Sequence, residues 1–249
     1  MTIKYFQKGF NFSQDGPGNR LVIHFQGCNL KCPWCSNPEG LKVGGTYSEN
    51  GKLSYTEVEV SDLVKECIDC EMMFFDGGGV TVTGGEATLQ FDALKMFFTQ
   101  LRANGINTAL ECNATHPRLP ELFELCDFLI LDCKHYDSQK HFEVCGVDNK
   151  IIINNIALAA KERSQLLVRI PLIGGFNSSV ADAEGFAKLF NEIATSACSF
   201  EFLTYHEFGK DKYAKLGMAY TVENAFVSDG DLAAFKEIFK KNSLKIIYT

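Results

Sequence analysis

The alternation of short apolar segments with amphipathic segments of helical period is the feature that most constrains the fold of this chain. The pattern predicts six strands, at 20–26, 80–83, 107–111, 128–132, 166–170 and 199–204. A helix, or a loop with helical content, follows each strand, and right-handed crossovers of this kind give a parallel sheet. The apolar runs agree, because parallel strands are covered on both faces. We predict an α/β fold, a partial (β/α)6 TIM-like barrel, with a flat doubly wound sheet as the alternative.

The regions outside these units fix the expected domain organisation. No internal repeat, linker or low-complexity segment is present, so we expect one domain over residues 1–249, with its core at about 20–205. The N-terminal segment, 1–19, is expected to be irregular because it contains turn-forming residues. Residues 38–56 should form a surface excursion, followed by a helix with Ser61 as its N-cap. The C-terminal part, 228–249, is expected to form a helix and a terminal strand.

Helical period predicts the remaining helices. They are expected at 91–104, just after Pro120, and near 138–145, 150–162, 179–195 and 229–241.

Composition excludes several classes of function. The net charge of −7 and the scattered basic residues argue against a nucleic-acid-binding protein. No apolar run approaches the roughly 18 residues of a membrane span, and the N-terminus lacks the pattern of a signal peptide. We therefore expect a cytoplasmic protein without a membrane partner. The 10 cysteines are diluted in a long chain, which argues against a disulfide scaffold. Most of those outside the segment described next are expected to be small core residues.

The segment Gly27–Asn37 follows the first expected strand and holds Cys28, Cys32 and Cys35. Three thiolates within eight residues can bind one small inorganic centre. The usual structural zinc or iron–sulfur site has four protein ligands, so these three thiolates are one ligand short. A cluster of four irons would leave one iron open to another ligand, whereas a zinc site would need a distant Cys or His.

Polar residues also follow the other expected strands. In parallel α/β folds, sites gather at the carboxyl ends of the strands. The segments expected at this rim are Thr83–Glu86, Glu111–Asn113, Asp132–Lys134, Arg169 and Tyr205–Glu207. We therefore expect these side chains to face the cysteine segment across one site.

The cysteine spacing resembles the cluster motif of the radical S-adenosylmethionine (SAM) enzymes. Four further segments resemble the glycyl-radical-enzyme activating enzymes of that superfamily: Asp15–Arg20, Gly79–Glu86, Leu131–Lys134 and Tyr205–Lys210. The resemblance implies one [4Fe–4S] cluster, with SAM bound to its fourth iron. It also implies reductive cleavage of SAM to a 5′-deoxyadenosyl radical, which takes a hydrogen from a glycine Cα of a partner enzyme. Flavodoxin or ferredoxin would donate the electron.

The resemblance also implies roles for individual residues. Cys28, Cys32 and Cys35 would hold the cluster and make up the catalytic set. The SAM-binding residues would be Trp34, Asn37, Gly84, Gly85, Glu86, Glu111, Asp132, Lys134, Arg169 and His206. The substrate peptide would be received by Asp15, Gly16, Pro17 and Arg20. Relatives can hold a monovalent cation near the positions of Glu111 and Asp132, although 112–114 departs from the family's Thr-Asn-Gly.

Many relatives carry a ferredoxin-like insert with two further clusters after the cysteine motif. Between Cys35 and Gly84 this chain has only Cys67 and Cys70, too few for such clusters. We expect the compact, single-cluster form, acting as a monomer. The alternatives are a radical SAM enzyme acting on a small molecule or another peptide, an iron–sulfur electron carrier or redox sensor, and a zinc-stabilised interaction protein.

Overall fold

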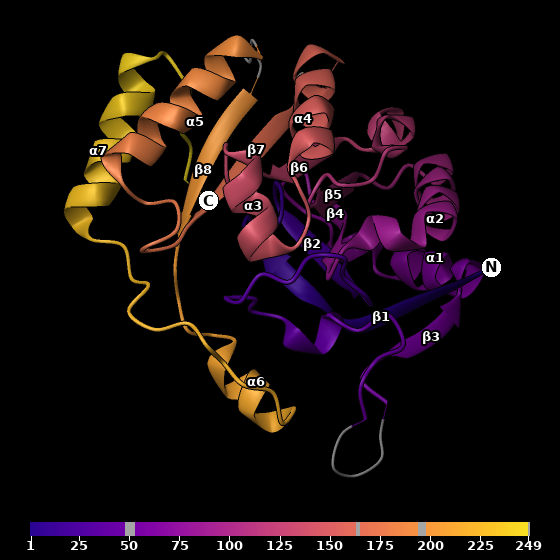
Figure 1. Cartoon of the computed structure of the whole chain (residues 1–249). Helices are drawn as coiled ribbons and strands as arrows, with labels where there is room; N and C mark the ends of the chain where they lie inside the picture. Colours follow the sequence, from indigo (N-terminus) through magenta and orange to yellow (C-terminus); the bar gives the residue numbers. More distant parts are fainter. Residues whose placement is uncertain (48–52, 163–164, 194–197, 249) are drawn as a thin grey trace.

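The computed structural model describes residues 1–47, 53–162, 165–193 and 198–248. Within these ranges, eight strands form one sheet in the order β3-β1-β2-β4-β5-β6-β7-β8 (Figure 1). The strands are β1 (Thr2–Phe12), β2 (Asn19–Phe25), β3 (Thr56–Glu59), β4 (Gly79–Gly84), β5 (Thr108–Cys112), β6 (Phe128–Asp132), β7 (Leu166–Leu172) and β8 (Cys198–Thr204).

Six of these strands, from β2 through β4–β8, run parallel to one another. In the described part of the chain β7 is the one named strand that pairs with β8, and β8 does not reach β3 at the other edge, so the sheet stays open. The predicted partial six-unit barrel is therefore confirmed. It is extended at the β2 edge by two antiparallel strands, β1 and β3, which the sequence analysis did not predict.

Helices cover the outer face of the curved sheet (Figure 1). They are α1 (Val60–Asp69), α2 (Phe91–Ala103), α3 (Ser138–Cys145), α4 (Lys150–Glu162), α5 (Val180–Glu192) and α7 (Asp229–Lys241). A short helix, α6 (Lys210–Lys215), lies apart from them. Short 3₁₀ turns lie at Pro38–Gly40, Glu71–Met73, Ala87–Gln90 and Leu119–Leu125.

Apolar stripes and caps explain where these helices form. Helix α2 buries Phe91, Leu94, Phe98 and Leu101, the face that its sequence predicted, against the sheet. Helix α5 begins with a capping box between Ser179 and Asp182, which satisfies two backbone amides of the first turn. The predicted helices are confirmed within the described ranges, except that the segment after Pro120 forms the 3₁₀ turn Leu119–Leu125 instead of an α-helix. Residues 194 and 195 of the predicted segment 179–195 lie outside those ranges.

The predicted irregular segment at 1–19 is wrong for residues 2–12, which form β1. This strand pairs with β2 from Tyr5 opposite Phe25 to Phe12 opposite Asn19, and its register shifts between Tyr5 and Gln7. A shift of this kind interrupts the alternation of buried and exposed side chains, so the period of two is hard to read from the sequence.

Two smaller predictions are also wrong. Ser61 is not an N-cap: α1 begins at Val60, and Glu59 precedes it without a side-chain capping bond. The expected strand at 244–248 is reduced, in the described residues, to one β-bridge between Ile246 and Phe200.

No helix in the described ranges is long and apolar enough to cross a membrane.

Candidate active site

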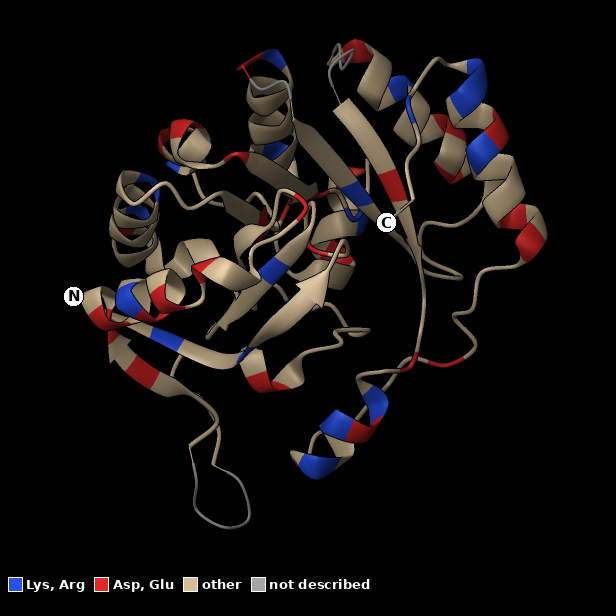
Figure 2. Cartoon of the chain, turned by 180° about the vertical axis from the view of Figure 1, so that it is seen from behind, with Lys and Arg blue, Asp and Glu red and all other residues tan. Residues whose placement is uncertain are grey.

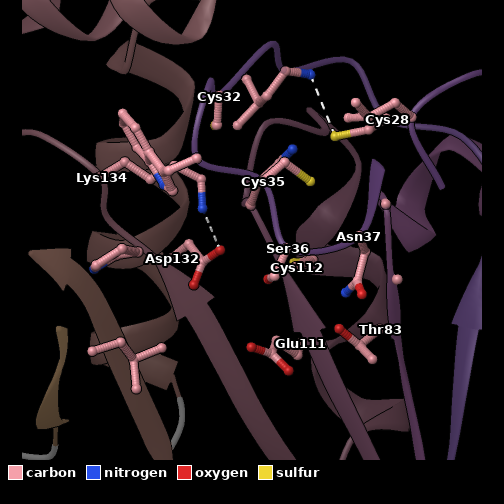
Figure 3. Close-up of a pocket in the computed structure, with 18 of the residues that line it drawn as sticks. Cys28, Cys32, Cys35, Ser36, Asn37, Thr83, Glu111, Cys112, Asp132 and Lys134 are labelled. Carbon is pink, nitrogen blue, oxygen red and sulfur yellow. Dashed lines mark hydrogen bonds and ion pairs between the residues drawn. The ribbon is translucent and has the colours of Figure 1, made fainter. Parts of the chain in front are cut away.

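One cavity of about 300 Å³ lies at the carboxyl ends of the six parallel strands. The cysteine loop bounds one side of it, and Thr83, Glu111 and Asp132 project from strand ends on the other side (Figure 3). The cavity is lined by twelve of the residues predicted for the site: Asp15, Cys28, Cys32, Trp34, Cys35, Asn37, Gly84, Gly85, Glu111, Asp132, Lys134 and His206. The structure therefore brings most of the predicted set together around one space.

Backbone hydrogen bonds on both sides hold the cysteine loop. The amide of Gly27 donates to the carbonyl of Gly40 at 2.8 Å, and that of Cys28 donates to Leu41 at 3.0 Å. Farther along, the amide of Lys31 donates to the carbonyl of Cys145 at 2.9 Å. These contacts fix the backbone, and the thiols project from it into the cavity.

Helix α6 was not predicted, and it packs against the end of this loop. The Lys212 ammonium lies 2.9 Å from Glu39 Oε1 and donates to Asn37 Oδ1 at 2.9 Å. A Cβ at Gly209 would lie 2.4 Å from the carbonyl oxygen of Cys35, so a larger residue could not approach this closely. In Figure 2 the lysines of α6 stand out as a short basic segment beside otherwise mixed charges.

The last residue of β4, Gly84, and the next residue, Gly85, allow the strand end to pack under the cysteine loop. Gly84 has φ +130°, and a Cβ there would lie 2.3 Å from the amide nitrogen of Phe25. At Gly85 a Cβ would lie 2.2 Å from the carbonyl oxygen of Gly27. Only glycine permits this approach.

The Glu86 carboxylate does not line the cavity, although the sequence predicted it for SAM binding. Its side chain is buried, with 1% of its surface exposed. It accepts hydrogen bonds from the amides of Asn113, at 2.7 Å, and Thr88, at 3.0 Å, and from the Thr88 hydroxyl. Burial raises the pKa of this carboxyl. Glu86 therefore ties the segment after β4 to the end of β5.

Asp132 and Lys134 form an ion pair at the cavity wall, with 2.6 Å between Oδ2 and Nζ (Figure 3). Burial alone would lower the pKa of Lys134, but the charge of Asp132, the hydrogen bond to it and the neighbouring thiols of Cys32 and Cys145 together outweigh burial and raise the pKa overall. The lysine stays positively charged at neutral pH.

Arg169 does not line this cavity, and its guanidinium is already engaged on three sides. Its Nε donates to Glu201 at 2.8 Å and its Nη1 donates to Glu111 at 2.7 Å. Its Nη2 donates to the carbonyl of Gln14. The predicted contact with the SAM carboxylate would therefore compete with an existing buried network.

The segment Asp15–Arg20 lies against the inner face of the sheet. Arg20 is fully buried, with 0% of its surface exposed, and its Nε donates to Thr81 Oγ1 at 2.7 Å. The same hydroxyl donates to the carbonyl of Asp15 at 2.7 Å, and Arg20 Nη1 donates to the carbonyl of Pro17 at 3.2 Å. The arginine supports the segment from below, while Asp15 faces the cavity.

A second hollow, the lateral groove, opens between β1 and β8. Its volume is about 690 Å³. Its lining residues include Gln7, Gly9 and Asn11 of β1, Glu201 and Leu203 of β8, and Phe208. It shares Asp15, His24, Ser36, Asn37, Leu203 and His206 with the cavity. The two hollows are therefore neighbours across the open side of the sheet.

Cys145 is the clearest residue that the sequence analysis missed. It is one of the cysteines outside the loop, most of which were expected to be small core residues, but its Sγ lies 3.7 Å from that of Cys32. The separation of 113 residues hides this contact from any local sequence pattern.

Comparison with known proteins decides the family. The profile of the Radical SAM superfamily matches residues 22–187, which is more than half of the chain. The chain belongs to the radical SAM superfamily. It is 31% identical over 243 residues to a pyruvate formate-lyase-activating enzyme from Staphylococcus aureus, with 93% of each chain covered.

Solved structures of radical SAM proteins agree with this assignment. A domain of a pyruvate-formate lyase-activating enzyme from Bacteroides vulgatus matches with a TM-score of 0.57 and 26% identity, covering 69% of this chain and 98% of that one. A radical SAM methyltransferase from Sphaerobacter thermophilus matches with a TM-score of 0.63 and 14% identity, covering 96% and 67%. The second likeness concerns the fold alone.

Radical SAM proteins use a [4Fe–4S] cluster and SAM, and the donor set around this cavity fits the cluster. Three thiols from one loop face one space, as a cubane bound through three of its irons requires. Burial raises the pKa of Cys28 to about 12 and that of Cys35 to about 11 in the metal-free chain. Iron stabilises the thiolate, so binding releases protons. Within the described ranges, no three His, Cys, Asp or Glu side chains form a site for a single metal ion.

Proposed function

We propose that this radical SAM protein activates a glycyl radical enzyme. The observation that carries the proposal is the site itself, where three cysteine thiols and the ends of six strands surround a cavity that adjoins a lateral groove. The similarity to the Staphylococcus aureus activating enzyme over 93% of both chains supports it. When bound, the cluster would supply the electron that cleaves SAM, and the deoxyadenosyl radical would take a hydrogen from a glycine of the partner enzyme.

For the chain's own residues, we propose that Cys28, Cys32 and Cys35 each bind one iron. Gly84 and Gly85 would hold the SAM amino group through their backbone, because they bring the chain close to the cavity. Trp34, Asn37 and His206 line the same space and would contact the rest of SAM.

Charged groups would orient SAM from the strand side. Lys134 carries a positive charge at the cavity wall, so we propose that it attracts the SAM carboxylate, with Asp132 fixing its position. Glu86 and Arg169 would act indirectly: Glu86 holds the strand ends together, and Arg169 fixes Glu111 and the backbone at Gln14.

The lateral groove would admit the partner's glycine-containing loop. Asp15, Gly16 and Pro17 would contact the peptide, because their segment lies beside the groove and Asp15 lines both hollows. Arg20 would support this segment, since its side chain is buried beneath it.

We do not extend the proposal to a monovalent cation. Glu111 is paired with Arg169, and Asp132 is paired with Lys134, so both carboxylates already have a positive neighbour. Reduction needs a one-electron donor, for which we propose a flavodoxin or ferredoxin. We also propose that the chain acts as a monomer in the cytoplasm.

The test begins with anaerobic reconstitution with iron and sulfide. The protein is then incubated with SAM, a reductant and pyruvate formate-lyase, and the mixture is examined by electron paramagnetic resonance. The proposal expects 5′-deoxyadenosine together with the doublet of a glycyl radical. Deoxyadenosine without a doublet, over a panel of glycyl radical enzymes, would favour a small-molecule or other peptide substrate. A chain that holds iron but never cleaves SAM would instead be an electron carrier or a sensor.

A further inference from the structure

The end of α3 is joined directly to the cysteine loop. Cys145 is the last residue of this helix, and Gly146 follows it in the left-handed conformation with φ 85°. The carbonyl of Cys145 accepts a hydrogen bond from the amide of Lys31 at 2.9 Å. Since Lys31 precedes Cys32, this bond fixes the helix end against the backbone of a cluster ligand.

The side chains of Cys145 and Cys32 are also in contact. Their Sγ atoms are 3.7 Å apart, within the distance of a hydrogen bond between sulfurs. Cys32 lines the cavity, whereas Cys145 does not and has 0% of its surface exposed. Cys145 therefore lies outside the cavity and away from solvent, so water does not compete for its contact with Cys32.

The chemistry of a cubane limits what a second thiol at this position can do. An iron bound by Cys32 already has three sulfide ligands from the cluster, so its four positions are filled. Cys145 could share a metal with Cys32 only in a single-ion site, where two thiolates on tetrahedral zinc lie roughly 3.8 Å apart. With a cubane at the loop, the open role for Cys145 is that of a hydrogen-bond donor.

We propose that Cys145 is a positioning residue that tunes the cluster by donating an S–H···S hydrogen bond to the sulfur of Cys32. Reduction places more negative charge on the ligand sulfurs, and a donor stabilises that charge. The bond therefore makes the cluster easier to reduce. This inference rests on the cluster of the proposed function and does not depend on the substrate.

The test compares Cys145→Ala with Cys145→Ser and with Cys198→Ala in the reconstituted full chain, without SAM or partner enzyme. Cys198 is a matched control, because it is also buried but lies at the start of β8. Potentiometric titration should show a more negative midpoint potential for Cys145→Ala alone. The serine variant retains a donor, so its potential should stay nearer to that of the unmodified protein. Iron content should be equal in all four proteins.

Two results would overturn the proposal. An unchanged potential in Cys145→Ala would mean that the cysteine only fills space, and loss of metal from that variant would mean that it is a ligand. A second measurement needs no variant: resonance Raman spectra after reconstitution in H₂O and in D₂O should differ in an iron–thiolate stretching band. Identical bands would contradict the bond even if Cys145→Ala fails to fold. Because both readouts precede SAM cleavage, they are independent of whether a glycyl radical is formed.

Discussion

The two sides of the cavity differ in how completely their polar groups are paired before any ligand binds. On the strand side, Asp132 is bound to Lys134 and Glu111 is bound to Arg169. On the loop side, Cys28 accepts a long contact from the amide of Leu30, at 3.4 Å. The charged groups of the strand side are therefore already paired with one another, whereas the thiols of the loop side are the groups that can bind a metal centre. This difference predicts that the paired residues of the strand side mainly stabilise the fold, and that the cysteines of the loop side mainly bind the cluster.

The largest effect is expected on the loop side. Cys32→Ala should reduce the iron of the reconstituted chain from about four atoms to near zero, because two thiolates leave the cluster without a third anchor. Cleavage of SAM should fall to background. Metal analysis and chromatographic detection of deoxyadenosine would measure both, with Cys198→Ala as the control. Iron retained at the normal level in Cys32→Ala would contradict the assignment.

On the strand side, the largest effect should be on stability. Arg169→Met leaves the buried carboxylate of Glu201 and the half-buried carboxylate of Glu111 without their arginine, at a cost of about 3–5 kcal/mol in the free energy of unfolding. Urea unfolding of the cluster-free chain would measure it. The control is Arg102→Met, whose exposed pair with Asp127 should contribute about 0–1 kcal/mol. If the two variants lowered the free energy of unfolding equally, the buried pairs of Arg169 would not be what stabilises the strand side.

Gly85→Ala tests the close packing between the end of β4, on the strand side, and the cysteine loop. The new Cβ would lie 2.2 Å from the carbonyl oxygen of Gly27, so the cysteine loop must shift. We expect a cost of about 1–3 kcal/mol, together with incomplete iron loading. Gly44→Ala is the matched control, because a Cβ there meets no atom within 4 Å. Full iron loading of Gly85→Ala, measured by metal analysis, would show that the loop does not depend on this packing.

The last prediction concerns the pH dependence of stability. Burial raises the pKa of Cys28 to about 12 and of Cys35 to about 11, above the value of about 8.5 for an unfolded chain. The folded, metal-free protein therefore binds more protons than the unfolded one at alkaline pH. The resulting stability is fully present below about pH 8.5 and is lost as pH rises towards 11–12. Urea unfolding at pH 7.5 and pH 10 should show the loss, and Cys28→Ala should reduce it. An unchanged difference in that variant would assign the effect to other groups.

The parallel part of the fold could be predicted because its signals are local. Leu129, Ile130 and Leu131 lie in an apolar run of the length of a strand, and the helices repeat their apolar residues at helical spacing. The strand β1 was missed because its register shift disturbs the alternation. Helix α6 has six residues and one buried side chain, Tyr213, which is too little for a periodic pattern.

The site was predictable where it depends on strand ends and motifs, and less so where it depends on pairing between distant residues. The cysteines, Asp132 and Lys134 were expected at the rim, and they line the cavity. Nothing local shows that Arg169 is already bound to Glu111 and Glu201, or that Cys145 contacts Cys32. Such contacts follow from the curvature of the sheet and from the position of α3.

The most direct test of the central claim is isotope transfer from the partner enzyme. Pyruvate formate-lyase labelled with deuterium at the glycine Cα would be incubated with the reconstituted protein, SAM and a reductant, and the deoxyadenosine would be analysed by mass spectrometry. An activase must place one deuterium in deoxyadenosine as the glycyl radical forms. Deoxyadenosine without deuterium, with no radical on the partner, would contradict glycyl-radical activation.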